Sequence, residues 1–289
     1  MRFDYLQPRT IEEALALLDK YRSDAKIIAG GTDLMIKMRA KLLDPKYVID
    51  ISGIAGLNCI ETDGNKGLRI GSLTTIRDLE TSEIINQQFP VLAQAAGQLG
   101  SVAIRNVATV GGNLCNALPS AETAQALLAL AATVRIMGPD KGERTVDLED
   151  FFTGAGTCAL QPNEILTEIA VPMPLHDTKS IYYKHSPRGS IDLAIVNIAV
   201  VLTNDPETRV CRDIKIVLGA VSSTPLRAKK AENILNGNII DDSMIARAAD
   251  MASAEASPRA GSIRGSAGYK KKIVRALTRR AIKTLLSTG

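Results

Sequence analysis

Two short segments, each with a pair of adjacent glycines, constrain this chain more than any other feature. The first reads Gly30-Gly31-Thr32-Asp33 and the second reads Gly111-Gly112-Asn113. Each follows a run of residues typical of a β-strand, so each is predicted to be a turn at a strand end. Glycine permits a positive φ and close approach of a ligand to the main chain, and consecutive free N–H groups bind anions. Two such turns facing each other could clamp a diphosphate from both sides.

A plainer interpretation stays open, in which both pairs are ordinary turns. The chain contains neither G-x-G-x-x-G nor G-x-x-x-x-G-K-[ST], the motifs of the common dinucleotide and phosphate loops. Thr32 and Asn113, however, add a side-chain donor to each turn. The recurrence of the pattern favours a site for a diphosphate without excluding two unrelated turns.

The histidine and cysteine content excludes most chemistry that a chain performs alone. There are two histidines and four cysteines, and no C-x-x-C motif. Neither histidine has a metal-binding or triad motif around it, and the scattered cysteines are read as reduced thiols. We therefore assign no catalytic residue and no metal ligand. The expected protein binds a cofactor that carries the chemistry.

Charge and hydropathy argue against nucleic acid and membrane partners. The net charge is +4, aromatic residues make up 3% of the chain and tryptophan is absent, so a single-strand binder that stacks bases is not expected. The basic stretch 270–280 carries apolar residues at helical spacing, which predicts an amphipathic helix with a solvated basic face. No apolar run approaches the roughly 20 residues of a membrane span, and the N-terminus lacks signal-peptide features. A cytoplasmic protein is expected.

The pattern of elements predicts an α/β region followed by a second unit. Strand and helix patterns alternate up to a break at residues 172–177, which contain two prolines. Before the break we predict helices at 11–18, 34–39, 91–99 and 122–132, strands at 26–29, 47–51, 58–62, 67–71 and 133–136, and a hairpin turn at Asp63-Gly64-Asn65. Thr10 is expected to cap the first of these helices, because Glu13 follows it at capping-box spacing. After it we predict strands at 180–185, 194–203 and 212–219 and helices at 246–256 and 270–286.

Residues 29–34, AGGTDL, and residues 104–114, IRNVATVGGNL, resemble the FAD-binding medium subunit of molybdenum hydroxylases. That family includes xanthine dehydrogenase, carbon monoxide dehydrogenase and nicotinate dehydrogenase. The resemblance covers nearly the whole chain, and two such motifs at this separation are highly specific. It implies an α+β fold: a two-lobed FAD-binding domain of the p-cresol methylhydroxylase type at 1–175, with lobes at about 1–55 and 56–175. A smaller domain with a three-stranded antiparallel sheet and a helical bundle follows at 176–289.

The resemblance also implies which residues contact FAD. Both glycine segments hold the diphosphate, and Leu34 lies against the flavin. Glu122 stands where family members usually have Asp, a contact to the ribityl or ribose hydroxyls. The implied FAD-binding residues are Ile27, Ile28, Ala29, Gly30, Gly31, Thr32, Asp33, Leu34, Leu99, Gly100, Thr109, Val110, Gly111, Gly112, Asn113, Asn116, Glu122, Leu166, Lys184, Asp192 and Leu193.

Three residues of the last predicted contact region admit plainer roles. The stretch from Lys184 through Arg188 to Leu193 matches the family's loop near the isoalloxazine ring. Lys184 and Arg188 could instead be surface charges. Asp192 could cap or pair locally.

The function implied by the resemblance is electron transfer within a larger complex. A large molybdopterin-cofactor subunit hydroxylates the substrate, a small subunit carries 2Fe–2S clusters, and FAD in this chain passes the electrons to NAD⁺ or another acceptor. A dimer of heterotrimers is expected. Two alternatives stay open: a stand-alone flavin oxidase of the same superfamily, and a partner-binding protein without its cofactor. The sequence identifies neither the substrate nor the terminal acceptor.

Overall fold

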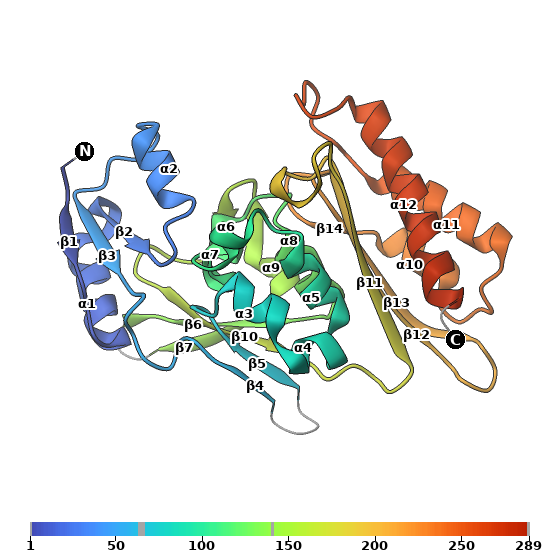
Figure 1. Cartoon of the computed structure of the whole chain (residues 1–289), viewed down its shortest axis with the longest axis horizontal. Coiled ribbons are helices and arrows are strands. Elements are labelled where there is room, and N and C mark those ends of the chain that lie inside the picture. The colour runs from blue at the N-terminus through green and yellow to red at the C-terminus, as the bar shows by residue number, and fades with distance from the viewer. Residues whose placement is uncertain (1, 63–66, 140–141, 288–289) are drawn as a thin grey trace.

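The three larger sheets of the described residues follow one another along the long axis of the molecule (Figure 1). The structure is a computed structural model that describes residues 2–62, 67–139 and 142–287. The predicted hairpin turn at 63–65 lies outside the described residues. The mixed helix and strand content confirms the predicted α+β class.

The first lobe is a small parallel sheet with the strand order β1-β3-β2. The predicted cap of its first helix is confirmed, because Thr10 Oγ1 accepts a hydrogen bond of 3.2 Å from the N–H of Glu13. Strand β2 runs directly into the first glycine segment, so the loop between β2 and α2 leaves the carboxyl end of the sheet. The elements are β1 (Asp4–Leu6), α1 (Ile11–Tyr21), η1 (Arg22–Asp24), β2 (Ala25–Ile28), α2 (Leu34–Arg39) and β3 (Tyr47–Asp50).

The second lobe is an antiparallel sheet with the order β4-β5-β10-β6-β7, covered by short helices. Its core is rich in leucine, isoleucine and alanine because the helices pack closely on the sheet. Its strands are β4 (Ile60–Thr62), β5 (Leu68–Gly71), β6 (Thr133–Met137), β7 (Glu143–Asp147) and β10 (Ile165–Val171), with β8 (Phe152–Gly154) and β9 (Thr157–Cys158) as a separate pair. Its helices are α3 (Ile76–Thr81), α4 (Glu83–Gln88), α5 (Pro90–Gly97), α6 (Val102–Arg105), α7 (Val110–Asn116), α8 (Glu122–Ala129) and α9 (Leu148–Phe151).

The C-terminal region is an antiparallel sheet buried on both faces. Helices α10, α11 and α12 cover one face, while α5 and α8 of the second lobe pack on the other. Consecutive residues of the central strand therefore serve two cores: Val200 packs under the C-terminal helices and Val201 packs against the second lobe. The elements are β11 (Thr178–His185), η4 (Gly189–Ile191), β12 (Val196–Asn204), β13 (Cys211–Gly219), β14 (Leu226–Arg227), α10 (Lys229–Leu235), α11 (Asp242–Glu255) and α12 (Ala267–Ser287).

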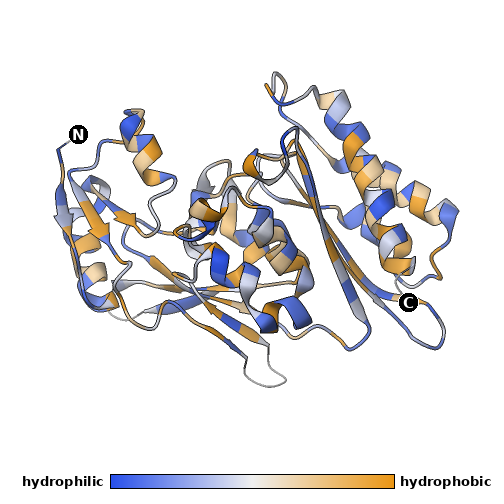
Figure 2. Ribbon diagram, viewed as in Figure 1, coloured by the Kyte–Doolittle hydropathy of each residue, from blue (hydrophilic) through white to orange (hydrophobic). Residues whose placement is uncertain are grey.

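Three predictions about these elements need correction. The predicted three-stranded sheet gains a fourth strand, because the two-residue β14 pairs with β13. The second glycine pair does not end a strand: Thr109 caps α7, and both glycines lie in the first turn of that helix. Hydrophilic and hydrophobic residues alternate along α12 (Figure 2), but its basic face is not wholly solvated. Lys270 is buried and donates a hydrogen bond of 2.8 Å to the carbonyl of Ala220.

Candidate cofactor site

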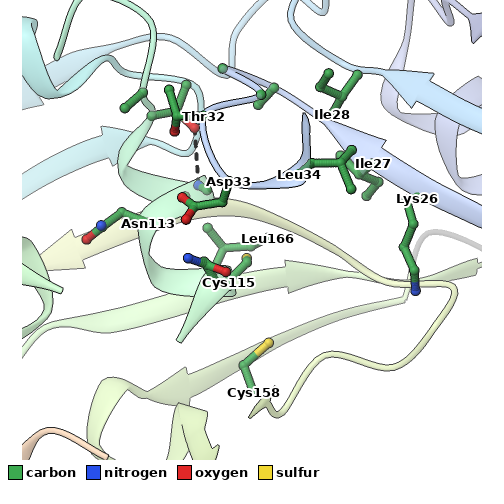
Figure 3. Close-up of a pocket in the computed structure, with 18 of the residues that line it drawn as sticks. Lys26, Ile27, Ile28, Thr32, Asp33, Leu34, Asn113, Cys115, Cys158 and Leu166 are labelled. Carbon is green, nitrogen blue, oxygen red and sulfur yellow. Dashed lines mark hydrogen bonds between the residues drawn. The ribbon is translucent and has the colours of Figure 1, made fainter. Parts of the chain in front are cut away.

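A cavity with a volume of about 860 Å³ opens between the first and second lobes. Its walls come from the loop after β2, from α7 and from β10 (Figure 3). Residues 191–193, at and after the end of η4, line it from the C-terminal region. A volume in the range of about 300–1,000 Å³ is typical of cofactor and ligand sites. The cavity is therefore large enough for a cofactor and is built from segments far apart in the sequence.

Most residues implied by the resemblance line this cavity. Val110 does not, because it is fully buried in the core of the second lobe. Lys184 is also outside the lining, because its side chain is buried against Glu122 and Gln98. The implied residues found in the wall are Ile27, Ile28, Ala29, Gly30, Gly31, Thr32, Asp33, Leu34, Leu99, Gly100, Thr109, Gly111, Gly112, Asn113, Asn116, Glu122, Leu166, Asp192 and Leu193.

The first glycine segment presents unpaired backbone donors. Within the described part of the chain, the N–H groups of Gly30, Gly31, Thr32 and Asp33 donate to no protein acceptor. Gly31 has a φ of +70°, which favours glycine. The adjacent helix α2 begins at Leu34, so the positive end of its backbone dipoles lies at the same loop. This segment has the features predicted for an anion-binding turn.

The second glycine segment differs from the prediction, because its N–H groups are occupied within the protein. Val110 and Gly111 donate to the carbonyls of Thr74 and Ser72 at 3.0 and 2.9 Å. Gly112 donates to Thr109 Oγ1 at 3.1 Å, as expected for an N-cap. This segment therefore does not form a second row of free amides.

Close packing explains the glycines of the second segment instead. A Cβ on Gly111 would lie 2.6 Å from the carbonyl oxygen of Ser72, so any side chain would displace backbone. A Cβ on Gly112 would meet Thr109 Oγ1 at 2.9 Å and no other heavy atom within 4 Å. Gly112 is also exposed in the cavity wall. Gly111 thus serves the fold, whereas Gly112 lies exposed in the cavity wall with only the Thr109 cap close to the position of a Cβ.

Several wall residues were not predicted from the sequence. Lys26 and Arg22, from β2 and the turn before it, add positive charge at one end of the cavity. Lys37 of α2 donates a hydrogen bond of 2.6 Å to Asn116 Oδ1 of α7 and so joins the two lobes. Lys26 directly precedes Ile27, the first of the implied FAD-binding residues, and this position could have identified it from the sequence. The contact between Lys37 and Asn116 could not have been predicted in this way, because the two residues are far apart along the chain.

The turn that ends α5 is held by two cations. The Arg105 guanidinium, 7% exposed, donates to the carbonyls of Leu99 and Gly100 at 3.1 and 3.0 Å. Lys184 Nζ donates to the carbonyl of Gln98 at 2.8 Å. Three successive carbonyls are thereby fixed, and with them the main chain that presents Leu99 and Gly100 to the cavity.

Each of these cations has a carboxylate partner. Arg105 binds Glu80 through two nitrogens at 2.8 and 3.2 Å. Burial works to raise the pKa of Glu80, but hydrogen bonds from Arg77 and Arg105 outweigh it and leave that pKa below its usual value. This pairing keeps the Arg105 charge compensated beside the turn.

Lys184 forms the second pair, with Glu122 at 2.7 Å. Their side chains are 1% and 6% exposed, so Lys184 is not the surface charge that the sequence left open. Burial raises the pKa of Glu122, and the charge of Lys184 offsets only part of that shift. Lys184 therefore reaches from β11 to two cavity-wall segments of the second lobe without entering the wall itself.

The loop after β11 supplies the rim at the other end of the cavity. Leu193 and Ile191 are exposed apolar residues there. Asp192 Oδ2 accepts a hydrogen bond of 3.0 Å from Arg188, which lowers the pKa of Asp192. The local pairing considered for Asp192 is thus present, and the residue also lines the cavity.

Comparison with known proteins identifies the chain. Residues 1–174 match the model of the FAD binding domain in molybdopterin dehydrogenase, and residues 181–285 match that of the CO dehydrogenase flavoprotein C-terminal domain. The chain belongs to the FAD-binding medium subunits of the molybdenum hydroxylase family. The predicted resemblance is confirmed, and FAD is the cofactor of this family.

Individual relatives agree with this family over their full length. The chain is 32% identical to the glyceraldehyde dehydrogenase medium chain of Sulfolobus acidocaldarius, with 97% of each chain covered. It is 34% identical to the carbon monoxide dehydrogenase medium chain of Hydrogenophaga pseudoflava, covering 97% of this chain and 96% of that one. A solved carbon monoxide dehydrogenase from H. pseudoflava, which lacks the Mo-pyranopterin moiety, matches with a TM-score of 0.94 over 99% of this chain and 98% of that chain. These medium-chain relatives are oxidoreductase subunits.

The flavoprotein subunit has neither a metal cluster nor a membrane-spanning helix among its described residues. No group of three or more His, Cys, Asp or Glu side chains there is placed to hold a metal ion. No helix in the described ranges is both long and apolar enough to cross a bilayer.

The cavity residues fit the FAD of the family. The free amides at Gly30 to Asp33 suit a dianionic diphosphate, and Gly112 leaves room in the opposite wall. In the described structure the buried hydroxyl of Ser72, which lines the cavity, has no hydrogen-bond partner.

Proposed function

We propose that this chain is the electron-relay subunit of a molybdenum-containing hydroxylase or dehydrogenase. In this proposal it accepts electrons from 2Fe–2S clusters of a small partner subunit and delivers them to NAD⁺ or another acceptor. The observation that carries the proposal is the row of free amides in the first glycine segment, facing a cavity that the second segment closes. When bound, FAD supplies the redox chemistry.

The chain's own residues bind and orient this cofactor. The amides of Gly30 to Asp33 hold the diphosphate, with Lys26 adding positive charge at the same wall. Arg105 and Lys184 fix the turn at Leu99 and Gly100, and Glu122 offers a carboxylate to a hydroxyl group. We propose as FAD contacts the other implied residues that line the same cavity, which leaves out the buried Val110.

The names of the relatives support a proposal about partners. Medium chains such as those of carbon monoxide dehydrogenase are named as parts of larger enzymes. We propose a large molybdopterin-cofactor subunit and a small iron–sulfur subunit, assembled as a dimer of heterotrimers. Four free cysteines fit a reducing compartment such as the cytoplasm. We also propose FAD-binding and C-terminal domains at 1–175 and 176–289, supported by the change of sheet between β10 and β11.

The test uses the chain purified with the proteins that accompany it in its own cell. Flavin, iron and molybdenum contents are measured on the complex. The complex is then reduced with dithionite and mixed with NAD⁺, oxygen or a quinone while the flavin absorbance is followed. The expected result is bound FAD, iron and molybdenum together, and rapid reoxidation by one acceptor.

Two results would contradict the proposal. A flavin-containing chain that purifies without iron or molybdenum, and oxidises a small substrate with oxygen, would identify the stand-alone flavin oxidase. A chain that retains no flavin after incubation with saturating FAD and removal of the excess would identify a partner-binding protein without cofactor.

A further inference from the structure

Two cysteines from different, adjacent elements line the wall of the FAD cavity. Cys115 lies on α7 and Cys158 on β9, and both line the cavity (Figure 3). The two elements pack against each other, and both side chains are partly buried against the core of the second lobe. Neither local sequence predicts this pairing, because the cysteines are far apart along the chain.

A backbone hydrogen bond joins the two elements that carry the cysteines. Helix α7 ends at Asn116, and its C-cap residue Ala117 has a φ of 49°, which turns the chain away. The carbonyl of Ala117 accepts a hydrogen bond of 3.0 Å from the N–H of Gly156, in the turn that leads into β9. The helix and the β8–β9 hairpin are thus joined within two residues of each cysteine.

The two thiols differ in acidity. The neighbouring Cys115 side chain lowers the pKa of Cys158 to about 7. The neighbouring Cys158 side chain, together with burial, raises the pKa of Cys115 well above its usual value. Near neutral pH, Cys158 is therefore partly a thiolate and Cys115 remains a thiol. This combination of an attacking and a resolving cysteine is typical of redox-active pairs.

The other cysteines lack these features. Cys211 is fully buried, and burial raises its pKa to about 12. Cys59 lies outside the cavity wall, with the carbonyl of Gly56 as its neighbour at 4.0 Å. The chain thus carries two internal controls.

We propose that Cys115 and Cys158 form an oxidisable dithiol site that reacts with hydroperoxide and closes to a disulfide in the cavity wall. The proposal rests on the proposed function, because a reduced flavin that meets oxygen is a source of hydrogen peroxide. The Cys158 thiolate attacks a peroxide oxygen, the O–O bond breaks, and the other oxygen leaves as water after taking a proton. Cys115 then attacks the sulfur of the sulfenic acid, the S–S bond forms, and the second oxygen leaves as water. Two thiols and one hydrogen peroxide give one disulfide and two waters.

The closed disulfide would join α7 to β9 covalently. Because α7 also carries Gly111 and Gly112, the bond would fix one wall of the cavity to the hairpin beside it. Reduction by a dithiol would reopen it.

The test measures thiols in the flavin-loaded protein. The protein is titrated with hydrogen peroxide, its remaining thiols are alkylated, and peptides are mapped by mass spectrometry. We expect a peptide pair linked through Cys115 and Cys158, lighter by two hydrogen atoms than the separate peptides. Dithiothreitol should separate the pair. The rate of formation should rise with pH through about 7 as the Cys158 thiolate forms.

Single serine variants separate the two roles. In Cys115→Ser, Cys158 should stop at sulfenic acid, which dimedone traps. In Cys158→Ser, Cys115 should resist the same peroxide, and Cys59→Ser should behave as wild type. Flavin absorbance, recorded first, shows that each variant is folded and loaded.

Two outcomes would overturn the dithiol site. One is oxidation of Cys59 at the same rate as Cys158, and the other is the absence of a linked peptide when both thiols are oxidised. A protein without flavin would refute the proposed function, whereas the peroxide reaction of the pair would still be measurable.

Discussion

The carbonyl oxygen of Val107 lies 1.8 Å from the point that a Cβ on Gly30 would occupy. The first and second lobes therefore touch through main chain at the edge of the cavity. No side chain fits between them, so Gly30 is required by close approach, and its φ is not positive.

Gly30→Ala should force these two segments apart. We expect a loss of about 1–3 kcal/mol in the free energy of unfolding, as for other overpacked sites, together with weaker FAD binding. Urea unfolding and flavin titration measure the two effects. Gly53→Ala is the matched control, because a Cβ there meets no atom within 4 Å. Equal behaviour of the two variants would show that the lobes are not in contact.

The two glycines of α7 should fail in different ways. Gly111→Ala pushes on the backbone of Ser72 and should lower the thermal unfolding temperature. Gly112→Val places its side chain in the cavity wall and should lower flavin occupancy with a smaller effect on unfolding. The flavin-to-protein ratio and the melting temperature separate these results. Full flavin occupancy in Gly112→Val would remove this residue from the cofactor site.

Lys184→Met should be strongly destabilising, because it leaves the Glu122 carboxylate buried and unpaired. The expected cost is about 3–5 kcal/mol, measured by denaturant unfolding. Adding Glu122→Gln should recover part of it in a double-mutant cycle. Lys229→Met, which breaks an exposed pair with Glu149, should cost less than about 1 kcal/mol. Independent effects of the Lys184 and Glu122 changes would contradict the pairing.

Arg105 and Arg77 bind the same carboxylate but differ in what else they hold. Arg105→Met should release the carbonyls of Leu99 and Gly100 and weaken FAD binding, while Arg77→Met should leave FAD binding nearly unchanged. Flavin titration of both variants provides the measurement. A larger loss of FAD affinity in Arg77→Met than in Arg105→Met would refute the role of the turn.

The Glu80 pairing also predicts a pH dependence of stability. The folded pKa of Glu80 lies below its ordinary value of 4.5, so its ionised form stabilises the fold above that pH. This contribution is lost as the pH falls through the lower, folded pKa. The difference in unfolding free energy between wild type and Glu80→Gln should therefore be full near neutral pH and shrink in acid. If this difference in unfolding free energy grew as the pH fell, the lowered pKa of Glu80 would be contradicted.

The sequence alone determined the family, the cofactor and most of the local structure. The periodicity of residues 11–18 and the cap at Thr10 identify α1 because these signals depend on neighbours a few positions away. The two glycine segments identify the FAD-binding family for the same local reason. The apolar runs of β12 and β13 likewise predict buried strands.

Only the tertiary structure decided which groups are available to a ligand. Among the described residues, no acceptor takes the amides of Gly30 to Asp33, whereas those of Val110 and Gly111 donate to the carbonyls of Thr74 and Ser72. Lys184 is drawn into a buried pair with Glu122, and Cys115 and Cys158 come to line the same cavity. Hydrogen-bond occupancy, burial and thiol acidity all depend on residues brought together by folding, and so no local pattern in the chain carries them.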